Sequence, residues 1–303
     1  MKHDHPGHSH GSGSYTRAFA VGITLNLGFV VIEALFGLRA HSLALLADAG
    51  HNFSDVLALL LAWAAAALAK RIPTQRRTYG LRRFSILAAL GNALLLLIAI
   101  GAIAWEAVSR LRNPEPVASG VVMAVAAVGI VINSVTALMF FSGRKGDVNI
   151  RGAYLHMAAD AAVSAAVVMA GFTIGVTGWL WLDPAMSLVV VAVIAVGTWG
   201  LLRESVDLAL DAVPRNVDAA TIEAYLRNLA GVREVHDLHI WGLSTTEAAL
   251  TAHLIKPDLA DDDVFLKEVS RELHERFGIE HPTVQIERGH GPTPCGLAAK
   301  DVV

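Results

Sequence analysis

One apolar stretch of the chain is long enough to cross a lipid bilayer and yet carries three ionisable side chains. It runs from Leu43 to Trp63, and Asp48, His51 and Asp55 lie in its first half. On membrane-insertion scales, each such group costs about 2.5–3.5 kcal/mol at the centre of the bilayer. Ionisable residues in spanning helices therefore usually have a function. Any membrane fold of this chain must give these three groups a partner or a ligand.

A second apolar stretch repeats the spacing of the first. His156 and Asp160 lie in AYLHMAADAAVSAAVVMA, so both stretches contain His-x-x-x-Asp. Residues four apart on a helix lie on nearly the same face, roughly 6 Å from each other. Each helix then presents one imidazole and one carboxylate. Together the two pairs predict a four-coordinate metal site inside a membrane, with the nitrogen and oxygen ligands that zinc prefers.

The ligand types favour Zn²⁺ and tolerate Co²⁺ or Cd²⁺. Two aspartates also leave a loaded site formally neutral, which an apolar environment demands. The alternative is that the four groups only form hydrogen bonds between helices. Asp48 has two open roles, since it could line the approach to the site or hold an imidazole, or it could mark the wet end of its helix. We expect Glu33 to lie near a helix end and to face water.

The composition places most of the chain in lipid. Of its 303 residues, 54% are hydrophobic and only 17% are charged, whereas soluble domains are about 25% charged. The sequence predicts six spanning helices of about 20 residues each. Asp183 and Pro184 are expected to cap and open the sixth helix. The predicted spans are 17–38, 43–69, 84–111, 117–141, 153–176 and 184–202.

Lysine and arginine predict the orientation in the membrane. The segment 70–83, after the second predicted helix, contains six of them and no acid. The loop after the fourth helix adds Arg144, Lys145 and Arg151. The positive-inside rule therefore places both loops and both chain ends in the cytoplasm, in a multi-pass protein of the cell membrane.

These patterns divide the chain into four parts. We expect a disordered tail with four histidines at 1–14, a six-helix membrane domain at 15–207, a cytoplasmic metal-binding and dimerisation domain at 208–290, and a loose tail at 291–303. The histidines of the first tail are His3, His5, His8 and His10. We expect these histidines either to bind metal weakly or to have no role.

After Arg203 the sequence becomes that of a small soluble domain. Asp218 is expected to cap a helix that ends near Gly231. Strands are predicted at 232–241, 247–255 and 283–287, and an amphipathic helix at 261–277. The order α-β-β-α-β indicates a compact α+β fold of ferredoxin-like type. Because a domain of roughly 80 residues is marginally stable alone, we expect a homodimer.

Histidines on the predicted strands suggest a second metal site. His236 and His239 are three residues apart, so a regular strand points them to opposite faces. Only one of them can then share a face with His253 and Glu287. We favour His236, His253 and Glu287 as a zinc-type cluster that senses cytoplasmic metal, although surface histidines of an ordinary domain are the alternative. Further candidates are His239, His281, His290 and Cys295.

Over residues 20–287 the chain resembles the cation diffusion facilitators, of the zinc-transporting type. The resemblance rests on SLALLADAGHNFSD, RRTYGLRRFSILAALGNALLL, DVNIRGAYLHMAADAAVS, LDPAMSLVV, LLRESVDLALDAVP and VHDLHIWGLSTTEAALTAHL together. It implies a homodimeric Zn²⁺/H⁺ antiporter that exports zinc, with six helices and a metallochaperone-like cytoplasmic domain. It also implies that both His-x-x-x-Asp motifs belong to the transport site.

Two departures from the family pattern stand out. Segment 70–83 lacks the histidines and acids of an additional metal site that some members carry, so that site is expected to be absent. Ser85 stands where relatives often have an acid, so a charge pair near the domain junction is expected to be rearranged. The candidate partners are Arg82, Arg83, Asp207 and Asp211.

Other functions fit part of the sequence. The same fold could carry Co²⁺, Cd²⁺, Mn²⁺ or Fe²⁺, since ligand type separates these ions poorly. A membrane metal sensor would bind metal without transport. An intramembrane zinc hydrolase would need an open water position and a base, as in His-Glu-x-x-His, and neither half-site has that base. The sequence thus favours a secondary transporter over an enzyme. Its expected partners are membrane lipid, divalent metal ions, protons and a second copy of the chain, with no nucleic acid.

Overall fold

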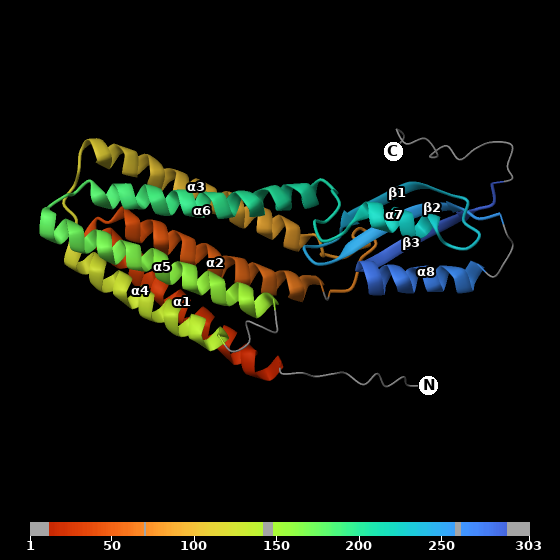
Figure 1. The fold of residues 1–303 in the computed structure, drawn as a ribbon, viewed down its shortest axis with the longest axis horizontal. Helices are drawn as coiled ribbons and strands as arrows, with labels where there is room; N and C mark the ends of the chain where they lie inside the picture. The colour runs from red at the N-terminus through yellow and green to blue at the C-terminus, as the bar shows by residue number, and fades with distance from the viewer. Residues whose placement is uncertain (1–11, 70, 142–147, 258–261, 290–303) are drawn as a thin grey trace. The chain divides into compact units, whose positions relative to one another are not determined.

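The computed structural model describes residues 12–69, 71–141, 148–257 and 262–289, which form eight helices and three strands (Figure 1). The membrane helices are α1 (Ser12–Ala40), α2 (Leu43–Ala69), α3 (Phe84–Arg112), α4 (Ser119–Phe140), α5 (Val148–Thr177) and α6 (Leu182–Ala209). The remaining elements are α7 (Ala219–Arg227), β1 (Glu234–Gly242), β2 (Ala248–Ile255), α8 (Asp262–Phe277) and β3 (Ile279–Glu287). The chain divides into two compact units, Met1–Leu59 with Asn92–Trp199, and Leu60–Gly91 with Gly200–Val303.

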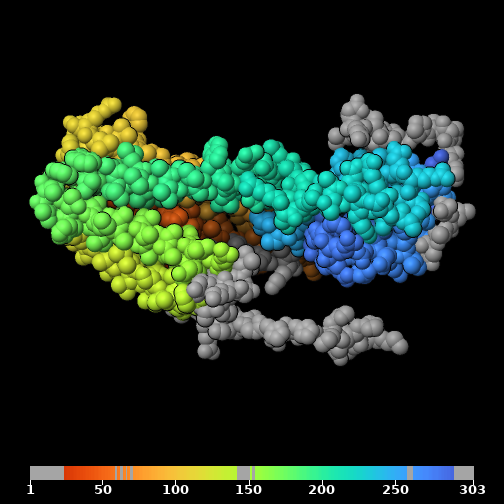
Figure 2. Space-filling view, in the orientation of Figure 1, coloured from red at the N-terminus to blue at the C-terminus, as the bar shows by residue number. Residues whose placement is uncertain are grey.

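All six predicted apolar helices are present. Among the described residues, α3, α4, α5 and α6 are long and apolar enough to cross a membrane. The 29 residues of α1 and the 27 of α2 each extend for about 40 Å, more than the roughly 30 Å of a bilayer core. On the face shown in Figure 2, α4, α5 and α6 form much of the surface of the first unit. Large apolar side chains are exposed on these helices, as lipid contact requires; Val196 is 79% exposed.

Helix α2 contributes to two apolar clusters within the first unit. One joins it to α1, α4 and α5 and includes Phe29, Leu45, Val125 and Val167. The other joins it to α3 and α6 and includes Ala47, Ile100 and Val190. Because apolar burial gives little driving force in lipid, close van der Waals packing has to hold such helices together. The ionisable residues of α2 therefore lie on a helix that other helices surround.

Helices α1, α4 and α5 approach one another closely at Gly129. A Cβ atom at this position would lie 2.8 Å from Cζ of Phe29 and 3.1 Å from Oγ of Ser164. A small residue is therefore needed for α4 to pack against both of its neighbours.

Asp183 was predicted to cap its own helix, but its carboxylate caps α2 instead. Helix α6 begins at Leu182, so Asp183 lies inside its first turn and not at the cap position. Oδ2 of Asp183 accepts a hydrogen bond from the Leu43 amide at 2.9 Å, and Oδ1 accepts one from the Ser42 hydroxyl at 2.5 Å. These bonds satisfy donors at the start of α2 that the helix itself cannot satisfy.

The second unit contains a three-stranded sheet in the order β1-β2-β3, in which β1 and β2 are antiparallel and β2 and β3 are parallel. The apolar core unites one face of this sheet with α7 and α8 and includes Ile222, Leu226, Val235, Leu250, Leu254, Val269 and Leu273. Asp218 caps α7 as predicted, accepting from the amides of Ala220 and Thr221. The Thr221 hydroxyl and amide lower the pKa of this carboxyl from its usual value.

Strand β3 begins at Ile279, four residues before the predicted start. The additional residues include Pro282, which cannot donate to a sheet ladder. In the described sheet, β3 lies at the edge and so has one side without a neighbouring strand. Proline is tolerated in that position. The predicted fold class, six membrane helices followed by an α+β domain, is confirmed.

Two arginines of the second unit bind acids of the same unit. Arg83 pairs with Asp211, one of the expected partners, whereas Arg82 pairs with Glu247 at 2.6 Å. The Ser85 hydroxyl accepts a hydrogen bond from the Thr245 amide at 3.1 Å. Ser85 thus contacts Thr245 through a neutral hydrogen bond and not through an ion pair.

The capping contact of Asp183 leads to a stability prediction. Asp183 and Ser42 are 2% and 0% exposed, so Asp183→Ala leaves two buried donors without an acceptor. Each such donor costs about 1–3 kcal/mol. We expect a clear drop in the thermal unfolding temperature of the detergent-solubilised protein, and a smaller drop for Asp183→Asn, which keeps one acceptor oxygen. If the alanine variant unfolded at the temperature of the parent protein, the contact would not support the fold.

Candidate metal centre

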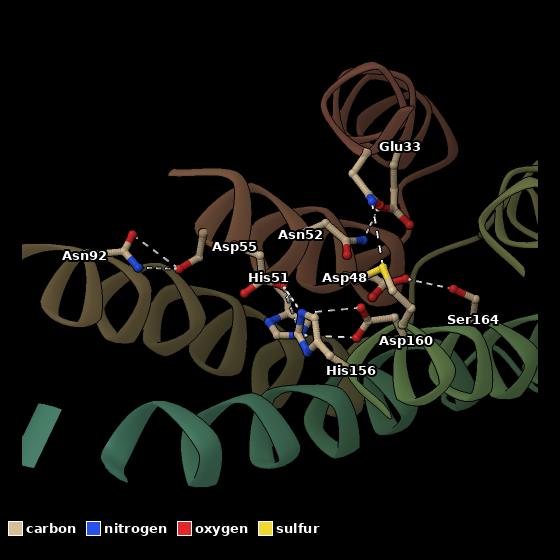
Figure 3. Close-up of polar contacts among 12 residues, drawn as sticks. Glu33, Asp48, His51, Asn52, Asp55, Asn92, His156, Asp160 and Ser164 are labelled. Carbon is tan, nitrogen blue, oxygen red and sulfur yellow. Dashed lines mark hydrogen bonds and ion pairs between the residues drawn. The ribbon is translucent and has the colours of Figure 1, made fainter. Parts of the chain in front are cut away.

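The two His-x-x-x-Asp motifs converge in the first unit, as Figure 3 shows. The motif of α2 supplies His51 and Asp55, and that of α5 supplies His156 and Asp160. Nε2 of His156 lies 3.0 Å from Oδ2 of Asp55, and Nε2 of His51 lies 3.5 Å from Oδ1 of Asp160. Within each motif, the imidazole and the carboxylate are 3.7 Å apart. One ligand atom from each residue lies within 4.8 Å of all the others.

These separations suit a tetrahedral metal ion. Bonds of about 2.0–2.2 Å place the ligand atoms of a tetrahedral zinc site about 3.3–3.6 Å apart. Nδ1 of His51 and Oδ2 of Asp160 are buried without a hydrogen-bond partner in the described part of the chain. Buried polar atoms rarely lack partners. Helix–helix hydrogen bonds alone, which were the alternative interpretation, leave Oδ2 of Asp160 unsatisfied, whereas a metal ion at the site would bind it.

Asp48 and Glu33 lie beside this group in the interior of the bundle. Asp48 is 1% exposed and accepts from the Ser164 hydroxyl at 3.3 Å. Asp48 therefore does not lie at a water-exposed end of its helix. Among the described residues, no hydrogen bond or ion pair joins its carboxylate to either imidazole.

Glu33 was expected to face water, and this was wrong. Its side chain is 0% exposed and reaches from α1 toward α2, where the Asn52 amide donates to Oε2 at 3.2 Å (Figure 3). Oε1 of Glu33 and Oδ1 of Asp48 have no hydrogen-bond partner in the described residues. The prediction of exposure rested on the position of Glu33 near the expected end of α1 at residue 38. It failed because the packing of α1 against its neighbours, and not the distance from the helix end, decides which side of the helix meets water.

A second group of ligand atoms lies on the sheet of the second unit. His253 Nδ1 is 3.0 Å and His236 Nε2 is 3.5 Å from Oε1 of Glu287. Ligand atoms of these three residues lie within 4.8 Å of one another. Both ring nitrogens of His236 are buried and lack a hydrogen-bond partner within the described residues. The donors and the unsatisfied imidazole fit a zinc ion.

A β-bulge overturns the prediction that His236 and His239 point to opposite faces. His236 pairs with His253, but the next pair joins His239 to Thr251, so two residues of β1 oppose one of β2. The backbone of Asp237, inside this bulge, has a φ of 49°. An extra residue restores the alternation of side chains for the rest of the strand. The two histidines therefore lie on the same face, opposite the apolar core.

Asp237 connects the remaining histidine of β1 to the group, and the sequence prediction did not include it. Its Oδ1 is 2.8 Å from His239 Nε2, and its Oδ2 is 3.5 Å from His253 Nε2. The sequence offered a signal, since Asp237 directly follows His236 in VHDLHIW.

The other candidates do not join either group. The His281 ring contacts the Tyr79 ring at 5.3 Å between centroids. His3, His5, His8, His10, His290 and Cys295 lie outside the described residues. Within the described ranges, groups of three or more ligand residues with all ligand atoms within 4.8 Å are the two given above.

Comparison with known proteins identifies the family. A model of the cation efflux transmembrane domain matches residues 19–208, and a model of the cation efflux protein cytoplasmic domain matches residues 214–289. The metal cation efflux system protein CzcD of Cupriavidus metallidurans is 37% identical over 98% of this chain and 91% of its own length. The zinc transporter ZitB of Escherichia coli is 36% identical over 90% of this chain and 88% of its own.

A third relative, from Bacillus subtilis, is described as a cadmium, cobalt and zinc/H⁺-K⁺ antiporter. It is 33% identical over 93% of this chain and 92% of its own length. Because the matches extend over both units, they exclude the alternative of an intramembrane hydrolase. The chain belongs to the cation efflux family, the cation diffusion facilitators, and is a membrane-embedded secondary transporter that exports divalent metal cations.

Proposed function

We propose that the transported ion is Zn²⁺, exported from the cytoplasm in exchange for protons, and that His51, Asp55, His156 and Asp160 are its ligands. The observation that carries the proposal is the convergence of these four donors from α2 and α5, at separations of 3.0–3.7 Å. The names of similar proteins support the choice of ion, since one is a zinc transporter and another a cadmium, cobalt and zinc antiporter. Co²⁺ and Cd²⁺ are the alternative substrates.

The same four side chains can bind either metal or protons. A histidine must be neutral to bind metal, so metal binding releases protons and acidification releases metal. Protons and Zn²⁺ therefore compete for the same site. Two imidazolium rings or one Zn²⁺ each balance the charges of Asp55 and Asp160. If the site opens alternately to the two sides of the membrane, inward proton movement drives outward metal movement.

Asp48 is assigned to the pathway rather than to the ligand set. Its carboxylate is held by the Ser164 hydroxyl on α5 and has no hydrogen bond to His51 or His156 within the described residues. A buried carboxylate three residues before His51 can attract a cation toward the ligands without binding it directly.

We also propose a regulatory metal site in the cytoplasmic domain, formed by His236, His253 and Glu287. Two imidazole nitrogens and one carboxylate oxygen would hold the ion and leave one position open to water or to another residue. Metal bound there would join β1, β2 and β3 and thereby bias the conformation of the transporter according to the cytoplasmic metal concentration. The protein is proposed to act as a homodimer in the cytoplasmic membrane, with both chain ends in the cytoplasm.

Removal of a ligand tests the transport site. We expect Asp55→Ala or Asp160→Ala to abolish zinc flux into proteoliposomes, because the remaining three donors cannot complete the site, while folding and dimerisation persist. Ser54→Ala is the matched control, since this neighbouring side chain bonds Asn92 instead of the site. Near-normal flux in either aspartate variant would remove that residue from the ligand set.

A set pH gradient tests the exchange of ions. Proteoliposomes that contain a pH-sensitive dye should show proton movement opposite to zinc movement, and a steeper gradient should raise the zinc flux. The same vesicles given Co²⁺ or Cd²⁺ rank the substrates. Zinc uptake without proton counter-movement would exclude antiport, and metal binding without flux would indicate a sensor.

The cytoplasmic site has a separate test. His253→Ala should change the apparent metal affinity of transport, or the stability of the dimer, more than it changes the maximal flux, because the proposed site regulates and does not conduct. Flux against zinc concentration and sedimentation of the purified dimer give the two readouts. Complete loss of flux would instead place the cytoplasmic domain in the transport pathway.

A further inference from the structure

We propose that Asp237 is a positioning residue for the cytoplasmic metal site. Its carboxylate holds one nitrogen of the His253 ring, so that the other nitrogen faces the metal. The inference rests on the proposed site of His236, His253 and Glu287, and assigns a role to a residue outside that ligand set.

The two nitrogens of the His253 ring face different carboxylates. Nδ1 is 3.0 Å from Oε1 of Glu287, and Nε2 is 3.5 Å from Oδ2 of Asp237. A metal ion held with Glu287 therefore binds Nδ1, and the proton of the neutral ring resides on Nε2. A metal-bound histidine usually donates its second N–H to a carboxylate or carbonyl, which determines both the tautomer and the ring orientation. Asp237 lies where such an acceptor is required.

The backbone explains how Asp237 reaches this position. In a regular strand, the residue after His236 would point to the opposite, apolar face of the sheet. The bulge and the φ of 49° turn Asp237 onto the face that carries the histidines. This left-handed conformation is disfavoured for residues other than glycine, although aspartate and asparagine adopt it more readily than most.

Contacts on both sides restrain the Asp237 side chain. It is 11% exposed, and its Oδ1 lies 2.8 Å from Nε2 of the more exposed His239. The distance of 3.5 Å to His253 exceeds the usual N–H···O range of about 2.7–3.2 Å. Metal binding at Nδ1 makes Nε2–H a stronger donor, so the contact is expected to shorten when the site is loaded.

The geometry does not favour a second metal ion held by Asp237 and His239. Within the described residues, His236, His253 and Glu287 form the group on this sheet whose ligand atoms all lie within 4.8 Å of one another. Asp237 and His239 do not complete another group of three by that measure. The structure thus assigns Asp237 to the orientation of His253.

The test uses the full-length protein with Asp55→Ala and Asp160→Ala, so that binding at the membrane site is removed. Zn²⁺ affinity is measured by competition with a chromogenic chelator, and Co²⁺ absorption reports the ligand geometry. Asp237→Asn keeps the size of the side chain and tolerates the backbone conformation. We expect it to weaken zinc binding about 10- to 100-fold, with altered Co²⁺ bands and an unchanged number of ions per chain.

Two further variants separate orientation from structure. His239→Ala removes the other partner of Asp237 but leaves its carboxylate, so its loss of affinity should be smaller than that of Asp237→Asn. Asp237→Gly relieves the backbone and removes the carboxylate, so it should bind zinc as weakly as the asparagine variant. Parent-like binding by the glycine variant would show that only the backbone conformation matters and would overturn the proposal.

The remaining outcomes are equally distinct. If Asp237→Asn kept the affinity and the Co²⁺ spectrum of its parent, Asp237 would not orient His253. If the parent of this series bound two ions per chain and Asp237→Asn lost one of them, Asp237 would be a ligand of a second ion, which would contradict the positioning role. If His253→Ala bound metal as its parent does, the cytoplasmic site itself would fail, and this inference would fail with it.

Discussion

A charge in an apolar environment requires a counter-charge, and this requirement governs the centre of the membrane unit. Each imidazole of the candidate site lies within 4 Å of a carboxylate on its own helix and of another on the facing helix. The two carboxylates need two positive charges, which one Zn²⁺ or two protons can supply. The replacement of one by the other keeps the site neutral. The donor set therefore favours exchange over the movement of metal alone.

The two groups of ligands are brought together by different secondary structure. In the membrane unit, helical periodicity brings each His-x-x-x-Asp pair onto one face, and the packing of α2 with α5 brings the pairs together. In the cytoplasmic domain, the ligands come from three strands, and His236, His253 and Glu287 share a face through regular strand pairing. The bulge in β1 adds Asp237 and His239 to that face, so regular structure suffices for both ligand sets and only the surroundings of the second depend on the irregularity.

Periodicity explains which features could be predicted from the sequence. The six helices, the α+β domain and the membership of both His-x-x-x-Asp motifs in one group follow from residue spacing and apolar length. The bulge at Asp237, the burial of Glu33 and the partner of Asp183 could not be predicted in this way. Each depends on contacts with residues far away in the sequence, such as Asn52 for Glu33 and Leu43 for Asp183. Local patterns contain no signal for such pairings.

The contact of Asp183 with the start of α2 has a mechanical consequence. The carboxylate belongs to α6, but the donors that it holds belong to Ser42 and Leu43, less than three helical turns before His51. The two helices are thus joined at one end, while among the described residues α2 contacts α5 through the ligand residues, the hydrogen bond from Ser164 to Asp48 and an apolar cluster. Any movement that separates α2 from α5 would then have to carry the start of α2 together with α6 or break the two hydrogen bonds of Asp183.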